Sequence, residues 1–262
     1  AVGRGQKQNA EISKSTYPGI ILVAIAYMKQ ASAHLPIAAA WARSGDFFED
    51  ARGLGMKVLV ACEYSGTVRN AFLDRGHDAW SCDLLPSEDG SNRHIIGDAR
   101  DLLNDGWDLL MVAHPPCTRL CNSGVRWLSA PPRGKTIDEM WEALDEGAAL
   151  FSDFWNAPIE RIAIENPVMH KHAKDRIVNF EDFAQSIQPW QFGHGETKRT
   201  CLWLKNLPPL TPTEVVSGRA PRVHHMSPSP DRWKERSRFY PGIAKAMADQ
   251  WGVFETCSAS LA

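Results

Sequence analysis

The sequence predicts an α/β protein with a doubly wound, mostly parallel sheet. From residue 56 onward, short apolar runs of strand length alternate with stretches of helical periodicity. Nearly every run ends in a polar or proline-containing turn, as in sheets whose strands are joined by helices. The 262 residues, 44% of them hydrophobic and 23% charged, suffice for one large domain of this kind with a small appendage.

The elements are predicted from periodicity, turn residues and β-branched content. The strands are expected at 57–62, 78–82, 94–97, 107–113 and 161–164, followed by a late hairpin of 189–192 with 201–204. The helices are expected at about 66–75, 137–155, 170–186 and 239–251.

Composition divides the chain into four parts. Residues 1–55, rich in Ala and Ile, are predicted to be an N-terminal extension with helices near 20–34 and 37–50. The remaining parts are a core at 56–204, a short basic segment at 205–237, and a C-terminal helix with a tail at 238–262.

Charge is unevenly distributed along the chain. Residues 56–190 carry 21 Asp/Glu and 13 Lys/Arg, whereas residues 191–262 carry six Asp/Glu and ten Lys/Arg. The formal net charge of −2 therefore hides a basic C-terminal third, where a polyanion such as nucleic acid would bind. A solvated basic surface without a partner is the alternative.

Cysteine usage indicates a reducing compartment, and hydropathy indicates that the chain does not span a membrane. The six cysteines are scattered and form no CxxC pair, unlike a disulfide framework. The longest apolar run, 20–28, is too short to span a bilayer and lacks the cleavage site of a signal peptide. We expect a soluble, cytoplasmic protein without membrane association, and nothing indicates an obligate protein partner.

Polar residues after the predicted strands indicate a nucleoside-bearing cofactor, because strand carboxyl ends meet at one edge of such a sheet. Asp83 could accept hydrogen bonds from a ribose diol and Asp98 from an adenine amine, although Asp98 could instead cap a helix. The first turn has a single glycine rather than GxGxxG, which disfavours a pyrophosphate and favours S-adenosylmethionine. The predicted cofactor-binding residues are Glu63, Tyr64, Ser65, Gly66, Asp83, Leu84, Asp98, Ala99 and Pro115.

Cys117 is the candidate nucleophile at this edge. It follows two prolines after a buried strand, and Arg119, Arg126 and a following helix are expected to lower the pKa of its thiol. A small apolar plug in a rigid turn is the alternative. A metal pair with Cys121 would need further ligands, of which only His114 is near in sequence, so we expect no metal.

Glu165 ends the next predicted strand and is the candidate partner of a nucleobase. A carboxyl group can accept a hydrogen bond from a base edge or, when protonated, donate one. A carboxylate at a helix N-terminus is the alternative reading.

Three short motifs, in order, carry a resemblance to a known family. They are Pro116-Cys117, Glu165-Asn166 and Thr197-Lys198-Arg199-Thr200. Their order and strand placement resemble the cytosine-C5 DNA methyltransferases, in the short form of phage and prophage genes, over residues 56–252. The resemblance implies a Rossmann-like, S-adenosylmethionine-dependent methyltransferase fold acting on double-stranded DNA in a bacterial or phage-infected cell.

The resemblance also implies roles for the motif residues. Cys117 would attack C6 of a flipped cytosine, and Glu165 would hold N3 and the exocyclic amine. Lys198 or Arg199 would lie near the cytosine carbonyl and the phosphate. C5 would then take the methyl group and lose its proton as the cysteine leaves, while the helix at 239–251 would close over the cofactor pocket.

The chain departs from the family at several motifs. Pro-Cys-Gln is Pro-Cys-Thr at Thr118, the Phe-x-Gly-x-Gly turn is Cys-Glu-Tyr-Ser-Gly at 62–66, and Glu-Asn-Val is Glu-Asn-Pro. Residues 205–237 are much shorter than the usual target-recognition region and predict mainly phosphate contacts. Trp127 could fill the space of a flipped base or anchor the core. The predicted DNA-binding residues are Arg119, Arg126, Lys205, Arg222, Arg232 and Lys234.

Three other functions stay open at this point. An amino-methyltransferase of adenine N6 or cytosine N4 would carry Asp/Asn-Pro-Pro-aromatic where this chain has His114-Pro115-Pro116-Cys117. A modifier of free cytosine nucleotides would need the same cysteine and carboxylate. A catalytically inactive DNA-binding relative would bind DNA without using either.

Overall fold

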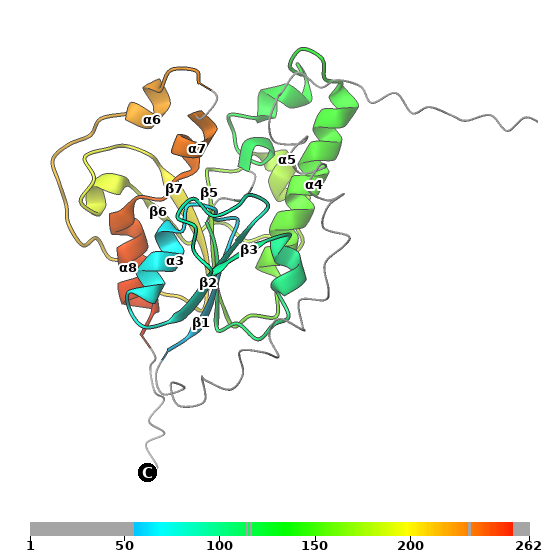
Figure 1. The fold of residues 1–262 in the computed structure, drawn as a ribbon. Helices are drawn as coiled ribbons and strands as arrows, with labels where there is room; N and C mark the ends of the chain where they lie inside the picture. Colours follow the sequence, from blue (N-terminus) through cyan, green and yellow to red (C-terminus); the bar gives the residue numbers. More distant parts are fainter. Residues whose placement is uncertain (1–54, 114, 116, 230–231, 254–262) are drawn as a thin grey trace, which may run out of the picture.

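The computed structural model describes residues 55–113, 115, 117–229 and 232–253. Its centre is a seven-stranded sheet with the strand order β3-β2-β1-β4-β5-β7-β6 (Figure 1). The first five strands are parallel, and β7 runs antiparallel to both β5 and β6. This order, with one reversed strand between β5 and β6, is that of Rossmann-like methyltransferase folds, and the predicted fold class is confirmed.

The elements are short and lie close to the predicted positions in most of the core. The strands are β1 Lys57–Ala61, β2 Asp78–Asp83, β3 His94–Ile96, β4 Leu109–Val112, β5 Arg161–Asn166, β6 Gln185–Ile187 and β7 Thr200–Lys205. The α-helices are α3 Thr67–Leu73, α4 Ile137–Trp155, α5 Lys171–Lys174, α6 Arg222–His225, α7 Arg232–Ser237 and α8 Pro241–Trp251. The 3₁₀ turns are η3 Ala99–Leu102, η4 Cys117–Arg119, η5 Val125–Leu128 and η6 Pro189–Gln191.

Two hydrophobic clusters pack on opposite faces of the sheet. Alternate residues of β1, such as Leu59 and Val60, belong to different clusters, because successive side chains of a strand point to opposite faces. Helices α3 and α8 cover one face, and α4 with α5 covers the other (Figure 1). Both faces are therefore buried, which explains why the strands are continuous apolar runs rather than alternating ones.

Helix α4, the longest described helix, starts at a capping box. The Thr136 Oγ1 atom accepts a hydrogen bond from the Glu139 N–H at 3.1 Å, and the Glu139 carboxylate accepts one from the Thr136 N–H at 2.8 Å. These bonds satisfy donors that a helix start otherwise leaves unpaired. The helix ends at Trp155, as predicted from the sequence.

Two predicted elements are wrong. The helix expected at 170–186 is only α5 at Lys171–Lys174, and the chain then runs irregularly to strand β6. The strand expected at 189–192 is the 3₁₀ turn η6, so the late hairpin pairs β6 with β7 instead. The helices expected at 20–34 and 37–50 lie outside the described residues.

No helix of the described residues has the length and apolar character needed to cross a membrane.

Candidate functional site

The turn after β1 is closed by the buried carboxylate of Glu63. Its two oxygens accept hydrogen bonds from the N–H groups of Val68, at 2.6 Å, and Arg69, at 3.1 Å. Both donors belong to the first turn of α3, where a helix has unpaired N–H groups. Burial raises the pKa of Glu63 to about 7, although these two bonds counteract the rise. The chain therefore fills this helix start with its own carboxylate.

Gly66 adopts a left-handed conformation, with φ of 72°, at the end of the same turn. A Cβ atom there would lie 2.2 Å from the Arg69 guanidinium, so only glycine fits this position. The Arg69 guanidinium is fully buried, donates to the Ser81 hydroxyl at 2.8 Å and forms an ion pair with Asp89. This network ties the loop after β2 to the first turn.

Asp83 and Asp98, the two predicted nucleoside ligands, lie in different electrostatic environments. Asp83 is half-buried at the end of β2, and this desolvation raises its pKa to about 6, partly offset by the Leu85 and Leu84 N–H groups. In the described part of the chain, no ion pair is formed by Asp83. Asp98 caps η3 and is paired with Arg100, which lowers its pKa. The cap expected as the alternative for Asp98 is present.

Helix α7 lies over the first turn. The Tyr64 and Trp233 rings are 5.9 Å apart between centroids, and the Tyr64 hydroxyl is 3.3 Å from the Ser237 hydroxyl. The Arg238 guanidinium donates to Glu88 at 2.8 Å. Two contacts to Tyr64 thus fasten the basic segment to the predicted cofactor turn, and Arg238, directly after the segment, binds the loop after β2.

The Cys117 loop lies directly beyond β4 and is held by the segment that follows Glu165. The Asn122 N–H donates to the Val168 carbonyl at 3.0 Å, and the His170 N–H donates to the Leu120 carbonyl at 3.0 Å. Between these bonds, Cys121 and Met169 form an antiparallel bridge. Main-chain pairing therefore holds the predicted nucleophile loop beside the strand that carries the predicted base-binding carboxylate.

Glu165 and Lys198 come from neighbouring strands. Glu165 is in β5, paired with Leu202 of β7, and Lys198 lies two residues before β7 begins. Both side chains line a small cavity of about 10 Å³, enough for one water molecule, together with Phe239, Tyr240 and Ile243. The Lys198 ammonium donates to the Arg238 carbonyl at 3.2 Å. Arg199 is exposed and donates to the Ser186 hydroxyl, so the two candidates of the basic motif are separated.

The charges of Cys117, Glu165 and Lys198 act on one another. Burial raises the pKa of the Cys117 thiol to about 12; Glu165 adds to the rise and Lys198 opposes it. Burial raises the pKa of Glu165 to about 7, again opposed by Lys198. Burial lowers the pKa of Lys198, which the two acidic groups counteract. The expectation that Arg119 and Arg126 lower the pKa of Cys117 is therefore wrong.

The predicted DNA-binding residues are divided between the two ends of the sheet. Arg119 and Arg126 lie in the Cys117 loop, and the Arg126 guanidinium stacks on Trp127 at 4.2 Å from the ring centroid. Trp127 also packs against the core, as its alternative reading expects. Lys205 pairs with Ile162 at the opposite end of β5 and lies far from Cys117. The other three, in α6 and α7, are Arg222, Arg232 and Lys234.

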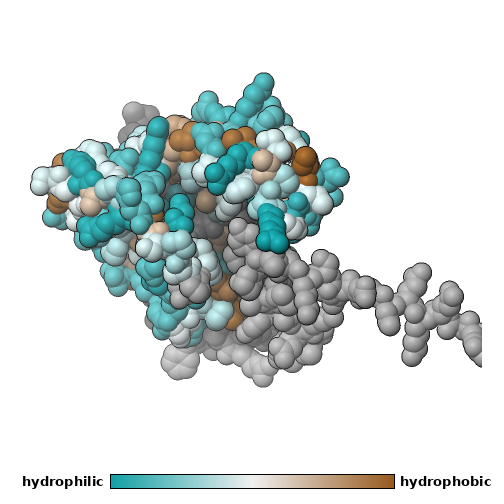
Figure 2. All heavy atoms as spheres, turned by 90° about the horizontal axis from the view of Figure 1, so that it is seen from above, coloured by the Kyte–Doolittle hydropathy of each residue, from teal (hydrophilic) through white to brown (hydrophobic). Residues whose placement is uncertain are grey.

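The surface above the carboxyl ends of the strands is largely hydrophilic. Figure 2 looks down on this end of the molecule and shows hydrophobic residues only in small separate groups. Among the described residues, no cluster of His, Cys, Asp and Glu side chains has the arrangement of a metal site.

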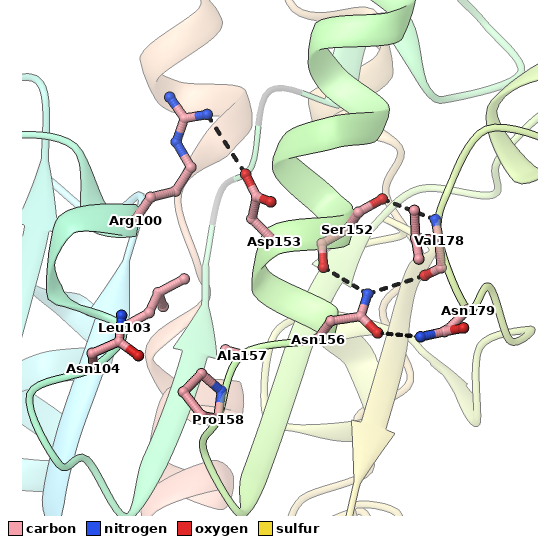
Figure 3. Close-up of a pocket in the computed structure, with 10 residues that line it drawn as sticks. All are labelled: Arg100, Leu103, Asn104, Ser152, Asp153, Asn156, Ala157, Pro158, Val178 and Asn179. Carbon is pink, nitrogen blue, oxygen red and sulfur yellow. Dashed lines mark hydrogen bonds and ion pairs between the residues drawn. The ribbon is translucent and has the colours of Figure 1, made fainter.

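A larger hollow lies away from these residues. A cavity of about 510 Å³ lies between η3 and the end of α4 (Figure 3). Its polar side chains bond mainly to one another: the Asn179 amide donates to the Asn156 side chain at 2.7 Å, and Arg100 pairs with Asp153 at 3.6 Å. The candidate site is defined by its chemistry rather than by cavity size.

The sheet topology and the groups at its edge define a protein of methyltransferase-like fold. No family model and no curated protein matches the chain. One similar solved structure is a prophage-encoded E. coli protein whose name proposes DNA modification methyltransferase activity; it is 14% identical with a TM-score of 0.38 and covers 62% of this chain and 52% of its own. Another is the structure of PH0851, which is 16% identical with a TM-score of 0.35; the match covers 58% of this chain and 42% of PH0851. The chain spans about half the length of these neighbours, and at such scores the likeness does not extend to activity.

Two groups near the site are absent from the sequence-based prediction. The Arg238 carbonyl binds Lys198, and His170 bonds to the Cys117 loop. Neither belongs to a motif. His170 is followed by Lys171 and His172, so the sequence gives no sign that it is buried, and a backbone carbonyl has no sequence signal.

Proposed function

We propose that the protein transfers a methyl group from S-adenosylmethionine to C5 of cytosine in double-stranded DNA. The observation that carries the proposal is the placement of Cys117 beyond β4 beside Glu165 of β5, which lines one cavity with Lys198. The charges of the three groups act on one another's pKa. A soft nucleophile, a carboxyl group that is half protonated near pH 7, and a cation form the set that addition to a cytosine ring requires.

The residues at the first turn fit the proposed cofactor. Glu63 already occupies the start of α3, so no N–H cradle remains there for a phosphate. Asp83, half-buried without an ion pair in the described chain, suits the two hydroxyl donors of a ribose. A nucleoside without phosphates, such as the adenosyl part of S-adenosylmethionine, meets both conditions. When bound, it would supply a methyl group on a positively charged sulfur.

The chain's own residues divide the chemistry between them. The Cys117 thiolate forms a bond to C6, and the C5–C6 electron pair moves toward C5. Glu165, neutral in part near pH 7, donates a proton toward N3 and so stabilises the charge that the addition creates. Once C5 carries the methyl group, loss of its proton restores the double bond and expels the Cys117 thiolate.

Lys198 supports this addition through its charge. Its positive charge lowers the pKa of the Cys117 thiol and so counteracts the effect of burial. A hydrogen bond to the Arg238 carbonyl holds Lys198 in position. Loss of a proton by Cys117 is favoured when Glu165 is neutral, because the Glu165 anion raises the thiol pKa. Hydrogen bonding of Glu165 to the base would therefore activate the nucleophile at the time it is needed.

The surrounding cations suit a DNA backbone. Arg126 and Arg119 lie on the Cys117 side of the site, and Arg222 and Lys234 lie in the segment before α8. Phosphate contacts from two sides would hold a duplex above the sheet edge while a base enters the site. Lys205 does not contribute to this surface because it lies at the opposite end of β7.

A trapping experiment tests the proposal. The protein is incubated with S-adenosylmethionine and duplex DNA of mixed sequence in which 5-fluorocytosine replaces cytosine, and is then denatured. Fluorine cannot leave C5 as a proton does, so the Cys117–C6 bond should persist as a covalent adduct. We expect an adduct with the wild type and with Cys121→Ser, and none with Cys117→Ser.

The negative outcomes are distinct. Absence of any adduct, together with absence of 5-methylcytosine on ordinary duplex DNA, would overturn the proposal. An adduct with free cytosine nucleotides but not with duplex DNA would reassign the substrate. An adduct that persists in Cys117→Ser would reassign the nucleophile.

A further inference from the structure

His170 is a buried histidine outside every motif, and it contacts the Cys117 loop in two ways. Its backbone N–H donates to the Leu120 carbonyl at 3.0 Å. Its ring Nε2 lies 2.7 Å from the Arg119 carbonyl oxygen. The Leu120 and Cys121 N–H groups in turn both donate to the Cys117 carbonyl at 3.0 Å. A continuous set of hydrogen bonds therefore links His170 to the backbone of Cys117.

The hydrogen bonds fix the tautomer of the ring. Nδ1 accepts a hydrogen bond from the Ala173 N–H at 3.1 Å and so carries no proton. Nε2 faces a carbonyl oxygen and so must donate. Burial lowers the pKa of His170, the hydrogen bond to the Arg119 carbonyl opposes this, and the neighbouring His172 and Arg176 side chains lower the pKa further. The lowered pKa favours the neutral ring. Each ring nitrogen thus has one defined task.

The two tasks concern different parts of the structure. The Nδ1 bond caps the start of α5 and stabilises the fold locally. The Nε2 bond reaches across to the Cys117 loop, 51 residues earlier in the chain. It fastens that loop to the segment after Glu165.

We propose that His170 is a positioning residue, whose Nε2–H group holds the Cys117 loop at the distance from Glu165 that the reaction requires. The inference rests on the proposed function for its catalytic consequence. Its structural part, the restraint of the loop, stands on the hydrogen bonds alone.

Two substitutions separate the tasks of the ring. The Oδ1 atom of asparagine takes the place of Nδ1, so His170→Asn keeps the cap and loses the donor to Arg119. The Nε2 atom of glutamine takes the place of the ring Nε2, so His170→Gln keeps the donor and loses the cap. A merely structural histidine would show no contrast between these variants in the Cys117 loop.

We expect His170→Asn to keep a thermal unfolding midpoint near the wild-type value but to lose about 100-fold in kcat, as reacting groups displaced by about 1 Å do. The KM for DNA should change much less than kcat, because the proposed phosphate contacts of Arg222 and Lys234 lie outside the displaced loop. His170→Gln should keep kcat near the wild-type value and unfold at a lower temperature, because a helix cap is lost.

A second readout does not depend on methyl transfer. Alkylation of Cys117 by iodoacetamide, followed by peptide mapping, reports how often the loop opens. We expect alkylation about fivefold faster in His170→Asn, the effect of losing one hydrogen bond on a local opening, and unchanged in His170→Gln.

Equal kcat and alkylation rates in His170→Asn and wild type would overturn the positioning role, as would equal losses of kcat in both variants. Should the wild type form no 5-methylcytosine, the proposed function fails, while the alkylation rates still decide the role of His170.

Discussion

Two buried glutamates, Glu63 after β1 and Glu165 in β5, differ in whether the rest of the described chain donates hydrogen bonds to their carboxyl groups. Burial raises the pKa of both carboxyl groups to about 7. The Glu63 oxygens accept hydrogen bonds from two N–H groups of α3. Within the described chain, no hydrogen bond is made by the Glu165 side chain, and only the charge of Lys198 favours its ionised form. The comparison teaches that a shifted pKa alone does not identify a functional carboxylate.

The regions around the two glutamates show the same contrast. At the first turn, Arg69, Ser81 and Asp89 satisfy one another, and the network is complete without a ligand. Around Glu165, a small cavity is lined by this carboxyl group, which makes no side-chain hydrogen bond within the described chain, and by the Lys198 ammonium group. Buried polar groups are normally paired, so the incomplete region is the one that suits a substrate.

The largest expected effect is the loss of catalysis when Glu165, the glutamate proposed to act on the base, is substituted. Glu165→Gln keeps the shape of the side chain but cannot transfer a proton to N3. We expect a loss of about 10²–10⁴-fold in kcat, the usual contribution of a positioned acid. Single-turnover transfer of a labelled methyl group from S-adenosylmethionine to duplex DNA measures it, with DNA affinity as the control. A variant within threefold of wild type would remove Glu165 from the mechanism.

The next effect concerns the stability of the fold, and here we expect substitution of Glu63 to have a larger effect than substitution of Glu165. Glu63→Ala leaves the Val68 and Arg69 N–H groups buried without an acceptor, and we expect a loss of about 2–4 kcal/mol in the free energy of unfolding. Glu165→Ala removes no hydrogen bond within the described part of the chain and should cost less. Urea unfolding of the two variants measures the difference. Equal losses would mean that the two carboxylates have the same structural role.

The smallest effect is the pH dependence of stability. A carboxyl group with a pKa of about 7 when folded and 4.5 when unfolded binds its proton more tightly in the fold. Its stabilising contribution is complete below pH 4.5 and is lost as the pH rises through 7. Glu165→Gln lacks this dependence, so the variant should gain at most about 3 kcal/mol relative to wild type between pH 4.5 and 8. Urea titrations at several pH values check it; a constant difference between the two proteins would contradict the raised pKa.

The sequence predicted the core well where packing and periodicity agree. The strands β1, β2, β4 and β5 are apolar because both faces of the sheet are covered, and their positions follow from that pattern. The region after α5 misled the prediction because Ala173, Ile177, Phe180 and Phe183 are spaced as on a helix. All four contact one hydrophobic cluster, but a left-handed residue at Asn179 interrupts the chain. Tertiary packing, not helical periodicity, explains that spacing.

The candidate site shows a similar division. The motif order placed Cys117 and Glu165 beyond adjacent strands, which follows from parallel topology. It could not separate Lys198 from Arg199, because neighbouring residues point in different directions and their partners lie elsewhere in the chain. It also could not foresee the far position of Lys205, which depends on the reversed direction of β7. The pKa of Cys117 depends on burial, which a sequence does not show.

The path of the chain between β7 and α8 defines where greater sequence specificity could be engineered. The segment leaves the sheet at the end opposite the candidate site and returns over the first turn through α7. The segment is attached to the body of the protein at several points, among them Leu210 beside Gln185, Ala220 beside Thr197 and Trp233 beside Tyr64. Between the last two attachments, residues 227–229 are exposed. Under the proposed function, a recognition module grafted there would enlarge the surface that faces DNA while leaving the sheet and its chemistry unaltered.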